Sequence, residues 1–357
     1  MNIQLQHPFQ GWRRSEESSK HGSGGAKAPR IGLALSSGGA RGLAHAGVIQ
    51  VLEEAGIPIA AIAGCSMGAY VGSLWASGLN GMQLEERAKE IKDRAALKAL
   101  MDYIIPPSEG LIRGEKLRKH LERDLGDKTF ADLHKPLIVI ATDLDRLTPH
   151  VFDSGTVSHA VHASSAIPAV CAPVKLNGRR YTDGGASEPL PVSILKNRFH
   201  LDAIIAVNVM PSPDDFESKS ERVFMTEDKP AFQLFSRMFR TFWQKVNLLA
   251  YGNVLDTFRR ALMSAQLHLI AKEEAAADVV IHPHYAASTW HDFENFGQYL
   301  QAGRDAANAA LPAIRALIQI KTYLNQETTS HEIAPSHTRL ERHAARDMAQ
   351  VADHAAA

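Results

Sequence analysis

Short apolar runs alternate along the chain with segments whose apolar residues recur at helical spacing. The plainest runs predict buried strands at Ile31–Leu35, Ile59–Ala63 and Pro136–Leu144. Helices are predicted between them at about 43–55 and 67–77, where Gly56 and Gly78 supply the C-terminal ends. This alternation predicts an α/β fold, a three-layer α/β/α sandwich with a mainly parallel central sheet.

The rest of the chain adds a hairpin and long helical regions. Asn177-Gly178 indicates a tight turn between two strands within 174–181. Further strands are predicted at 203–209 and 279–281, and helical regions at 82–124, 230–274 and 297–321. The polar, glycine-rich start and the polar end predict one catalytic domain over 30–322, a flexible segment 1–29 and a loosely ordered tail 323–357.

The amino-acid composition bears on the binding partners to be expected and on the redox state of the cellular compartment. Lysine plus arginine and aspartate plus glutamate both number 39, so no overall field attracts nucleic acid, and none is expected. Two cysteines, Cys65 and Cys171, are too few for a disulfide framework and indicate a reducing compartment. Without a membrane-spanning run or a secretory signal, we expect a cytoplasmic protein with at most peripheral contact at the inner membrane surface.

The sequence Gly64-Cys65-Ser66-Met67-Gly68 has the G-x-S-x-G pattern of a nucleophile elbow. It follows a predicted strand and opens a predicted helix, as such an elbow requires. Gly64 and Gly68 permit the sharp turn that exposes the Ser66 hydroxyl. The alternative is a glycine-rich turn with an incidental serine, but the strand and helix on either side favour a nucleophile.

A second loop, Ser37-Gly38-Gly39-Ala40-Arg41-Gly42, also joins a strand to a helix. Adjacent glycines expose backbone N–H groups that can converge on an oxyanion or on a phosphate. A nucleotide site is disfavoured because neither the P-loop pattern nor the G-x-G-x-x-G spacing is present. Beside a nucleophile elbow, the loop is interpreted as an oxyanion hole.

The third element is Asp183-Gly184-Gly185, after the hairpin strand. A serine hydroxyl needs a base to remove its proton, and an aspartate whose pKa is adjusted by burial and hydrogen bonding can serve. Taken alone, Asp-Gly-Gly is more typical of an ordinary turn than of a catalytic site.

In this order the three elements resemble the patatin-like phospholipases, particularly their single-domain bacterial members. The resemblance covers about residues 30–320 and extends to three further blocks, Gly110–Gly114, Thr142–Leu144 and Ala163-Ser164-Ser165-Ala166-Ile167-Pro168. It implies a serine acyl hydrolase of the phospholipase A or lysophospholipase type, acting on a lipid or lysolipid through an acyl-enzyme. It implies no cofactor and no metal.

Carried over by position, the resemblance implies a catalytic dyad of Ser66 and Asp183 without a histidine. It places the oxyanion hole at the backbone amides of Gly38 and Gly39, with that of Ala40 or Met67 as a further donor. Supporting roles within the motifs go to Arg41, Gly42, Gly64, Gly68, Gly184 and Gly185. Ser37 stands where the family has a further glycine, so Gly38 and Gly39 are the main expected donors.

Two other functions stay open at this point. An α/β-hydrolase esterase would complete a Ser-Asp-His triad with a late histidine, namely His282, His284 or His291. A lipid-binding regulatory module of the same fold would keep these residues with little turnover.

Aromatic residues recur at helical spacing in one predicted helix, as Phe232, Phe235, Phe239 and Phe242 with Trp243. Basic residues between them suit docking on an anionic membrane or lining an acyl pocket. Packing in the core or in a homodimer is the commoner use of such a stripe.

Overall fold

The computed structural model describes residues 28–91, 98–104, 109–212, 254–285, 288 and 291–333. The chain divides into two compact units, one of residues 30–312 and one that combines 1–29 with 313–357. The strands and the candidate site described below all belong to the first unit. No helix in these described ranges is both long and apolar enough to cross a membrane.

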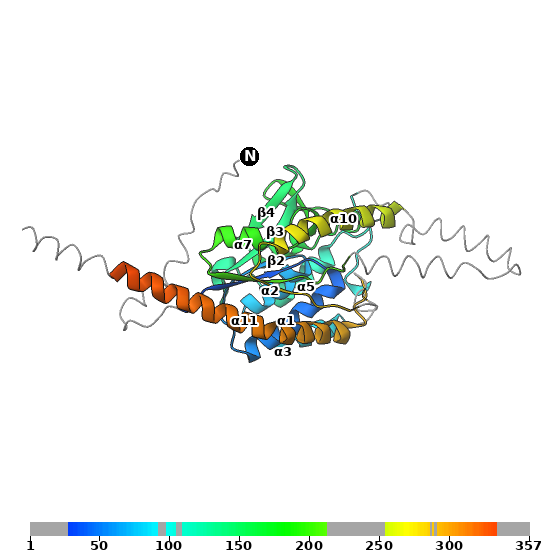
Figure 1. Cartoon of the computed structure of the whole chain (residues 1–357). Helices are drawn as coiled ribbons and strands as arrows, with labels where there is room; N and C mark the ends of the chain where they lie inside the picture. The colour runs from blue at the N-terminus through cyan, green and yellow to red at the C-terminus, as the bar shows by residue number, and fades with distance from the viewer. Residues whose placement is uncertain are drawn as a thin grey trace, which may run out of the picture. The chain divides into compact units, whose positions relative to one another are not determined.

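One mixed sheet forms the centre of this unit (Figure 1). Its strands are β1 (Ile31–Leu35), β2 (Ile59–Cys65), β3 (Leu137–Asp143), β4 (Thr148–Phe152), β5 (Val174–Leu176), β6 (Arg179–Asp183), β7 (Ala203–Val207) and β8 (Val279–Ile281). The order is β5-β6-β3-β2-β1-β7-β8, with β4 added beside β3. The neighbouring strands β3, β2, β1, β7 and β8 are parallel. Strands β4, β5 and β6 form antiparallel pairs. The predicted mainly parallel sheet is confirmed.

Helices cover both faces of the sheet, which confirms the predicted three layers (Figure 1). One layer holds α1 (Ala44–Glu54), α2 (Met67–Ala76), α3 (Gly81–Glu90), α5 (Glu115–Leu125) and α6 (Val157–Ser164). The other holds α7 (Val192–Arg198) and α10 (Val254–Glu274). Every residue of β1, β3 and β7 is buried, because a sheet covered on both faces needs apolar side chains in both directions.

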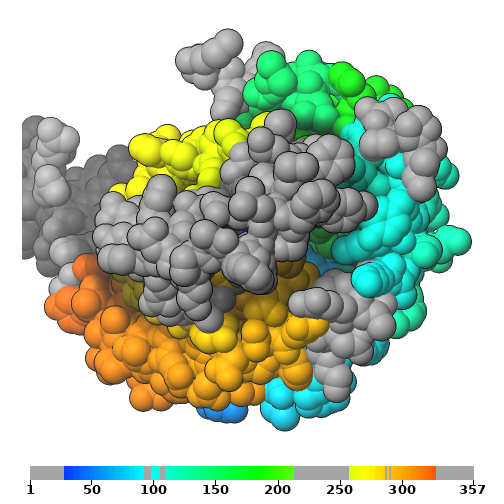
Figure 2. Space-filling view, turned by 90° about the vertical axis from the view of Figure 1, so that its right-hand side faces the viewer, coloured from blue at the N-terminus to red at the C-terminus, as the bar shows by residue number. Residues whose placement is uncertain are grey.

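The layer with α7 and α10 buries its own apolar cluster against the sheet. Leu195 of α7 and Ile270 of α10 pack with small sheet residues such as Ala34 and Ala63. The opposite side of α10 forms part of the molecular surface, seen in yellow in Figure 2. Helix α10 corresponds to the second part of the helical region predicted over 230–274. The aromatic stripe from Phe232 to Trp243 lies outside the described residues.

The last helix, α11 (Phe296–Ile333), packs closely against α1 at its beginning. A Cβ atom on Gly303 would lie 2.1 Å from the carbonyl oxygen of Ala44, so only glycine permits this approach. The helix is longer than the predicted 297–321, and it passes residue 322 without a break. The domain boundary placed at 322 stays a prediction.

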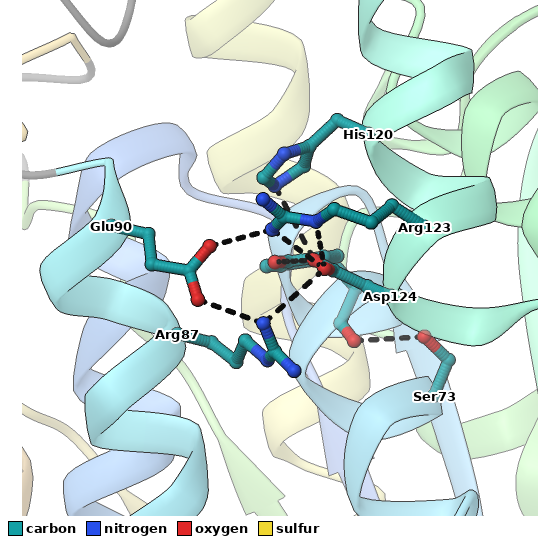
Figure 3. A network of polar contacts seen from close by, with 7 residues as sticks. Ser73, Arg87, Glu90, His120, Arg123 and Asp124 are labelled. Carbon is teal, nitrogen blue, oxygen red and sulfur yellow. Dashed lines mark hydrogen bonds and ion pairs between the residues drawn. The ribbon is translucent and has the colours of Figure 1, made fainter.

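A network of polar side chains around the buried carboxylate of Asp124 fixes α2, the helix that follows Ser66 (Figure 3). The Tyr70 hydroxyl of α2 donates to Asp124 at 2.8 Å. Asp124, whose side chain is fully buried, also lies 2.7 Å from Arg123, 3.3 Å from His120 and 3.7 Å from Arg87. These contacts join α2 to α3 and α5.

Candidate active site

Ser66 occupies a strained backbone position between β2 and α2, with φ 53° and ψ −118°. Such a conformation costs about 1–3 kcal/mol in a residue with a side chain, and it is typical of functional turns. Cβ atoms on Gly64 and Gly68 would lie 2.6 Å from the Ala69 Cα and 2.5 Å from the Leu35 carbonyl oxygen. The two glycines are therefore needed for close backbone packing around the elbow.

The strand register brings Ser66 to Asp183. Strand β4 occupies one edge of β3 over 139–143, so β2 and β6 share the other edge. Along this edge β2 ends at Cys65, opposite Ile140, and the antiparallel β6 ends at Asp183, opposite Ala141. The two strands thus meet end to end, and the residues at their ends are neighbours although 117 positions separate them.

At this junction the Ser66 hydroxyl donates a hydrogen bond to Asp183 Oδ2 at 2.6 Å. The other carboxylate oxygen, Oδ1, accepts the backbone N–H of Gly185 at 2.8 Å. Gly184 must be a glycine, because a Cβ there would lie 2.2 Å from the Ile140 carbonyl oxygen. The Asp-Gly-Gly sequence therefore turns tightly enough to return an N–H group to its own aspartate.

Burial raises the pKa of Asp183 from 3.8 to about 6, and the hydrogen bonds from Ser66 and Gly185 limit the rise. A carboxylate with this pKa is still ionised at neutral pH, but it is a stronger base than an exposed aspartate. The arrangement can accept a proton from the hydroxyl that touches it.

The glycine loop lies beside the elbow because β1 and β2 are adjacent parallel strands. It forms a 3₁₀ turn over Gly39–Leu43 that begins with Gly39 at φ 58°. A Cβ on Gly42 would lie 2.4 Å from Met67 Cγ, so loop and elbow are in direct contact. Within the described residues, the N–H groups of Gly38, Gly39 and Ala40 donate to no acceptor, which leaves them available to an oxyanion.

Arg41 points away from the loop and is buried. Its Nε donates to the Ser288 hydroxyl at 2.9 Å and its Nη2 to the Ser288 carbonyl at 3.3 Å. These bonds tie the glycine loop to the segment after β8. Arg41 and His284 line a small cavity there with Val209 and Tyr299, and neither Ser66 nor Asp183 belongs to its lining.

No histidine of the described ranges is hydrogen bonded to Ser66 or Asp183. His282 and His284 follow β8, which β7 and β1 separate from β2. His45 lies closer to the glycine loop, but its Nε2 is 2.9 Å from the Ser36 carbonyl oxygen, and burial lowers its pKa to about 4. In this part of the chain, no cluster of three or more His, Cys, Asp or Glu residues could hold a metal ion.

Three further residues position the site, and sequence reasoning gave them no role. Thr142 donates to the Asp183 carbonyl at 2.9 Å, and Gln266 of α10 donates to the Gly185 carbonyl at 3.0 Å. The Ser164 hydroxyl accepts the Ser66 backbone N–H at 2.8 Å. Thr142 and Ser164 lie in blocks that resemble the family, but only the three-dimensional contacts show what they hold.

Part of the chain is similar in sequence to known proteins. Residues 33–196 match the family model described as patatin-like phospholipase. An uncharacterized NTE family protein of Mycobacterium tuberculosis is 40% identical over 188 residues, which cover 52% of this chain and 50% of that protein. Lysophospholipase nte1 of Aspergillus fumigatus is 32% identical over 181 residues, 50% of this chain and 12% of that protein.

Among solved structures, VipD from Legionella pneumophila matches with a TM-score of 0.41 and 15% identity, covering 81% of this chain and 67% of that one. The matched residues of this chain include the glycine loop, the elbow and Asp183. Residues 33–196 therefore match the patatin-like phospholipase family. The chain spans about half the length of the mycobacterial relative.

Proposed function

We propose that this protein hydrolyses carboxylic ester bonds of lipids, as a phospholipase A or lysophospholipase. The observation that carries the proposal is the 2.6 Å hydrogen bond from the Ser66 hydroxyl to the buried Asp183, formed at a strained elbow. The family match supports a lipid ester as the substrate class. The name of the Aspergillus relative, a lysophospholipase, makes lysophospholipids the first substrates to test.

In the proposed reaction, Ser66 Oγ attacks the ester carbonyl carbon while Asp183 takes the hydroxyl proton. The negative charge that develops on the carbonyl oxygen is stabilised by the amides of Gly38, Gly39 and Ala40, with the N-terminus of α2 behind the elbow. The C–O bond then breaks, Asp183 returns the proton to the leaving alcohol, and the acyl group stays on Ser66. Water then attacks the acyl carbon while Asp183 takes its proton. The bond from the acyl carbon to Ser66 Oγ breaks, the fatty acid leaves, and Asp183 returns the proton to Ser66 Oγ.

A Ser-Asp-His triad is the main alternative mechanism. A triad needs a histidine between the aspartate and the serine, whereas here the two side chains contact each other directly. A regulatory module without turnover is the other alternative. Against it, the site keeps an acceptor for the serine proton and unused N–H groups in the glycine loop.

The setting of this activity is also part of the proposal. We assign catalysis to a domain over residues 30–322, in a cytoplasmic protein that contacts membrane only peripherally to reach its substrate. A homodimer is a further proposal, which rests on the aromatic stripe of the sequence alone.

A substrate panel tests the function. Purified full-length protein would be assayed with lysophospholipids, diacyl phospholipids and short-chain esters, with Ser66→Ala as the matched control. We expect fatty acid release by the unchanged protein only, and covalent labelling by a fluorophosphonate probe that disappears in Ser66→Ala. Folded protein that neither releases fatty acid nor reacts with the probe would contradict the proposal.

A further inference from the structure

Residues 164–166, at the end of α6, contact the backbones of both members of the proposed dyad. We infer that this segment fixes the distance between nucleophile and base, and that Ser164 is a positioning residue for Ser66. The inference rests on the proposed function, because it assigns a role within that same site. It gives the block from Ala163 to Pro168 a physical purpose.

On the nucleophile side, the Ser164 hydroxyl lies between two backbone groups. It accepts the Ser66 N–H at 2.8 Å and donates to the Ile140 carbonyl at 2.5 Å. Strand β2 stops pairing with β3 at Cys65, opposite Ile140. Where the backbone pairing of β2 with β3 ends, the Ser164 hydroxyl therefore bridges the next residue, Ser66, to Ile140 of β3.

On the base side, the carbonyl oxygen of Ala166 accepts two hydrogen bonds. The backbone N–H of Asp183 donates to it at 2.8 Å, and the Thr182 hydroxyl donates at 2.6 Å. Ala166 thereby holds the backbone of Asp183, and it lies two positions after Ser164, which holds the backbone of Ser66. Movement of α6 relative to the sheet would change both attachments together.

The segment itself is firmly placed. Ser164 is fully buried, and its neighbours Ala163 and Ala166 pack with Ala141 and Tyr181 of the sheet. Ser165, between the two attachment points, is only half buried, and its hydroxyl makes no hydrogen bond within the described residues. The hydroxyl of Ser164 thus bonds to the backbone of the site, whereas that of the adjacent Ser165 does not.

This difference supplies the experiment. Ser164→Ala leaves the Ser66 N–H and the Ile140 carbonyl without their shared partner, so the elbow can relax away from Asp183. We expect kcat and the rate of fluorophosphonate labelling at Ser66 to fall about 10- to 100-fold, since misplacement by an ångström can have this effect. KM is expected to stay the same, because Ser164 does not contact substrate.

Ser165→Ala is the matched control and is expected to keep both rates. Ser158→Ala removes another fully buried hydroxyl of α6, one without a partner, and is also expected to keep them. If Ser164→Ala does not fold, Ser164→Cys makes the same comparison. Its thiol fills the space but is a weak donor and acceptor, so an intermediate rate is expected.

The inference is overturned if folded Ser164→Ala reacts at the unchanged rate, or if Ser165→Ala is slowed as much. It is also overturned if Ser164→Ala raises KM and leaves kcat unaltered. Failure of the proposed function has a different signature, because then the unchanged protein itself shows no Ser66-dependent labelling.

Discussion

Asp183 and Asp124 are both buried aspartates, and they differ in the charge of their partners. Asp124 lies among Arg87, Arg123 and His120 and also accepts the Tyr70 hydroxyl (Figure 3). Asp183 accepts only the Ser66 hydroxyl and the Gly185 N–H, and no Lys or Arg of the described ranges forms an ion pair with it.

The comparison shows how one residue type serves two purposes. Cations around a carboxylate balance its negative charge and connect it to the helices that carry them. A carboxylate that is buried with neutral donors keeps its basicity, as the raised pKa of Asp183 shows. Asp124 therefore suits a structural link between helices, and Asp183 suits proton transfer.

The largest expected effect comes from Asp183→Asn. An amide cannot take the hydroxyl proton, so we expect kcat/KM to fall about 10⁴-fold. Burial disfavours the charge of Asp183, so its loss should leave the melting temperature equal or higher. Steady-state kinetics and thermal unfolding check the two statements. Activity above a tenth of the unchanged protein would remove Asp183 from the role of base.

The pH dependence of the activity is the next test of the role of Asp183. Only ionised Asp183 can act as base, so kcat/KM should fall tenfold per pH unit below about 6, where its pKa lies. Because this pKa is raised on folding, the cost of burying the charge is relieved as pH falls from about 6 towards 3.8. Loss of activity at pH 5 should therefore occur without loss of fold, which circular dichroism can verify.

Asp124→Asn should have the opposite effects to Asp183→Asn, with lower stability and little change in kcat. It leaves Tyr70 without a charged acceptor and removes one of two carboxylate partners from Arg87 and Arg123, which keep Glu90. Breaking a buried ion pair is destabilising. Because the two arginine side chains are 37% and 53% exposed and can turn to water, we expect a loss of about 1–3 kcal/mol. Urea unfolding measures it. A fall in kcat as large as that of Asp183→Asn would break the contrast.

The smallest effects are expected at the late histidines. His282→Gln, His284→Gln and His291→Gln should each leave kcat/KM unchanged, since Ser66 and Asp183 are bonded without an intermediate imidazole. The same assay as for Asp183→Asn applies. Loss of activity in any one of them, with the fold intact, would favour the triad.

The parts of the fold that depend on local pattern were predictable from sequence. Strands β1, β2, β3, β7 and β8 are consecutive apolar runs, and their positions agree with the predictions within two residues at either end. The hairpin turn is also found, with Asn177 at φ 52° and Gly178 at φ 75°. Strand β4 was missed, because Thr148–Phe152 contains Pro149 and has no buried residue.

The candidate site was predictable only as a set of residues. Motif order identified Ser66, Asp183 and the glycine loop, but the distance between serine and aspartate follows from strand register, which pattern does not reveal. Ser164 shows this limit, because its role depends on Ser66 and Ile140, which lie 98 and 24 positions away. The role of Asp124 does not follow from local pattern either, since Tyr70 and Arg87 contact it from two other helices.

The end-to-end meeting of β2 and β6 along one edge of β3 has a consequence for synthesis of the chain. A ribosome-bound chain that has emerged only to β3 already contains the nucleophile, but its base is still to be made. The site closes only when β6 pairs with β3, and β4, α6 and β5 must be made between these two strands. Under the proposed function, hydrolytic power would appear only in the finished domain, so unfinished chains would leave nearby membranes intact.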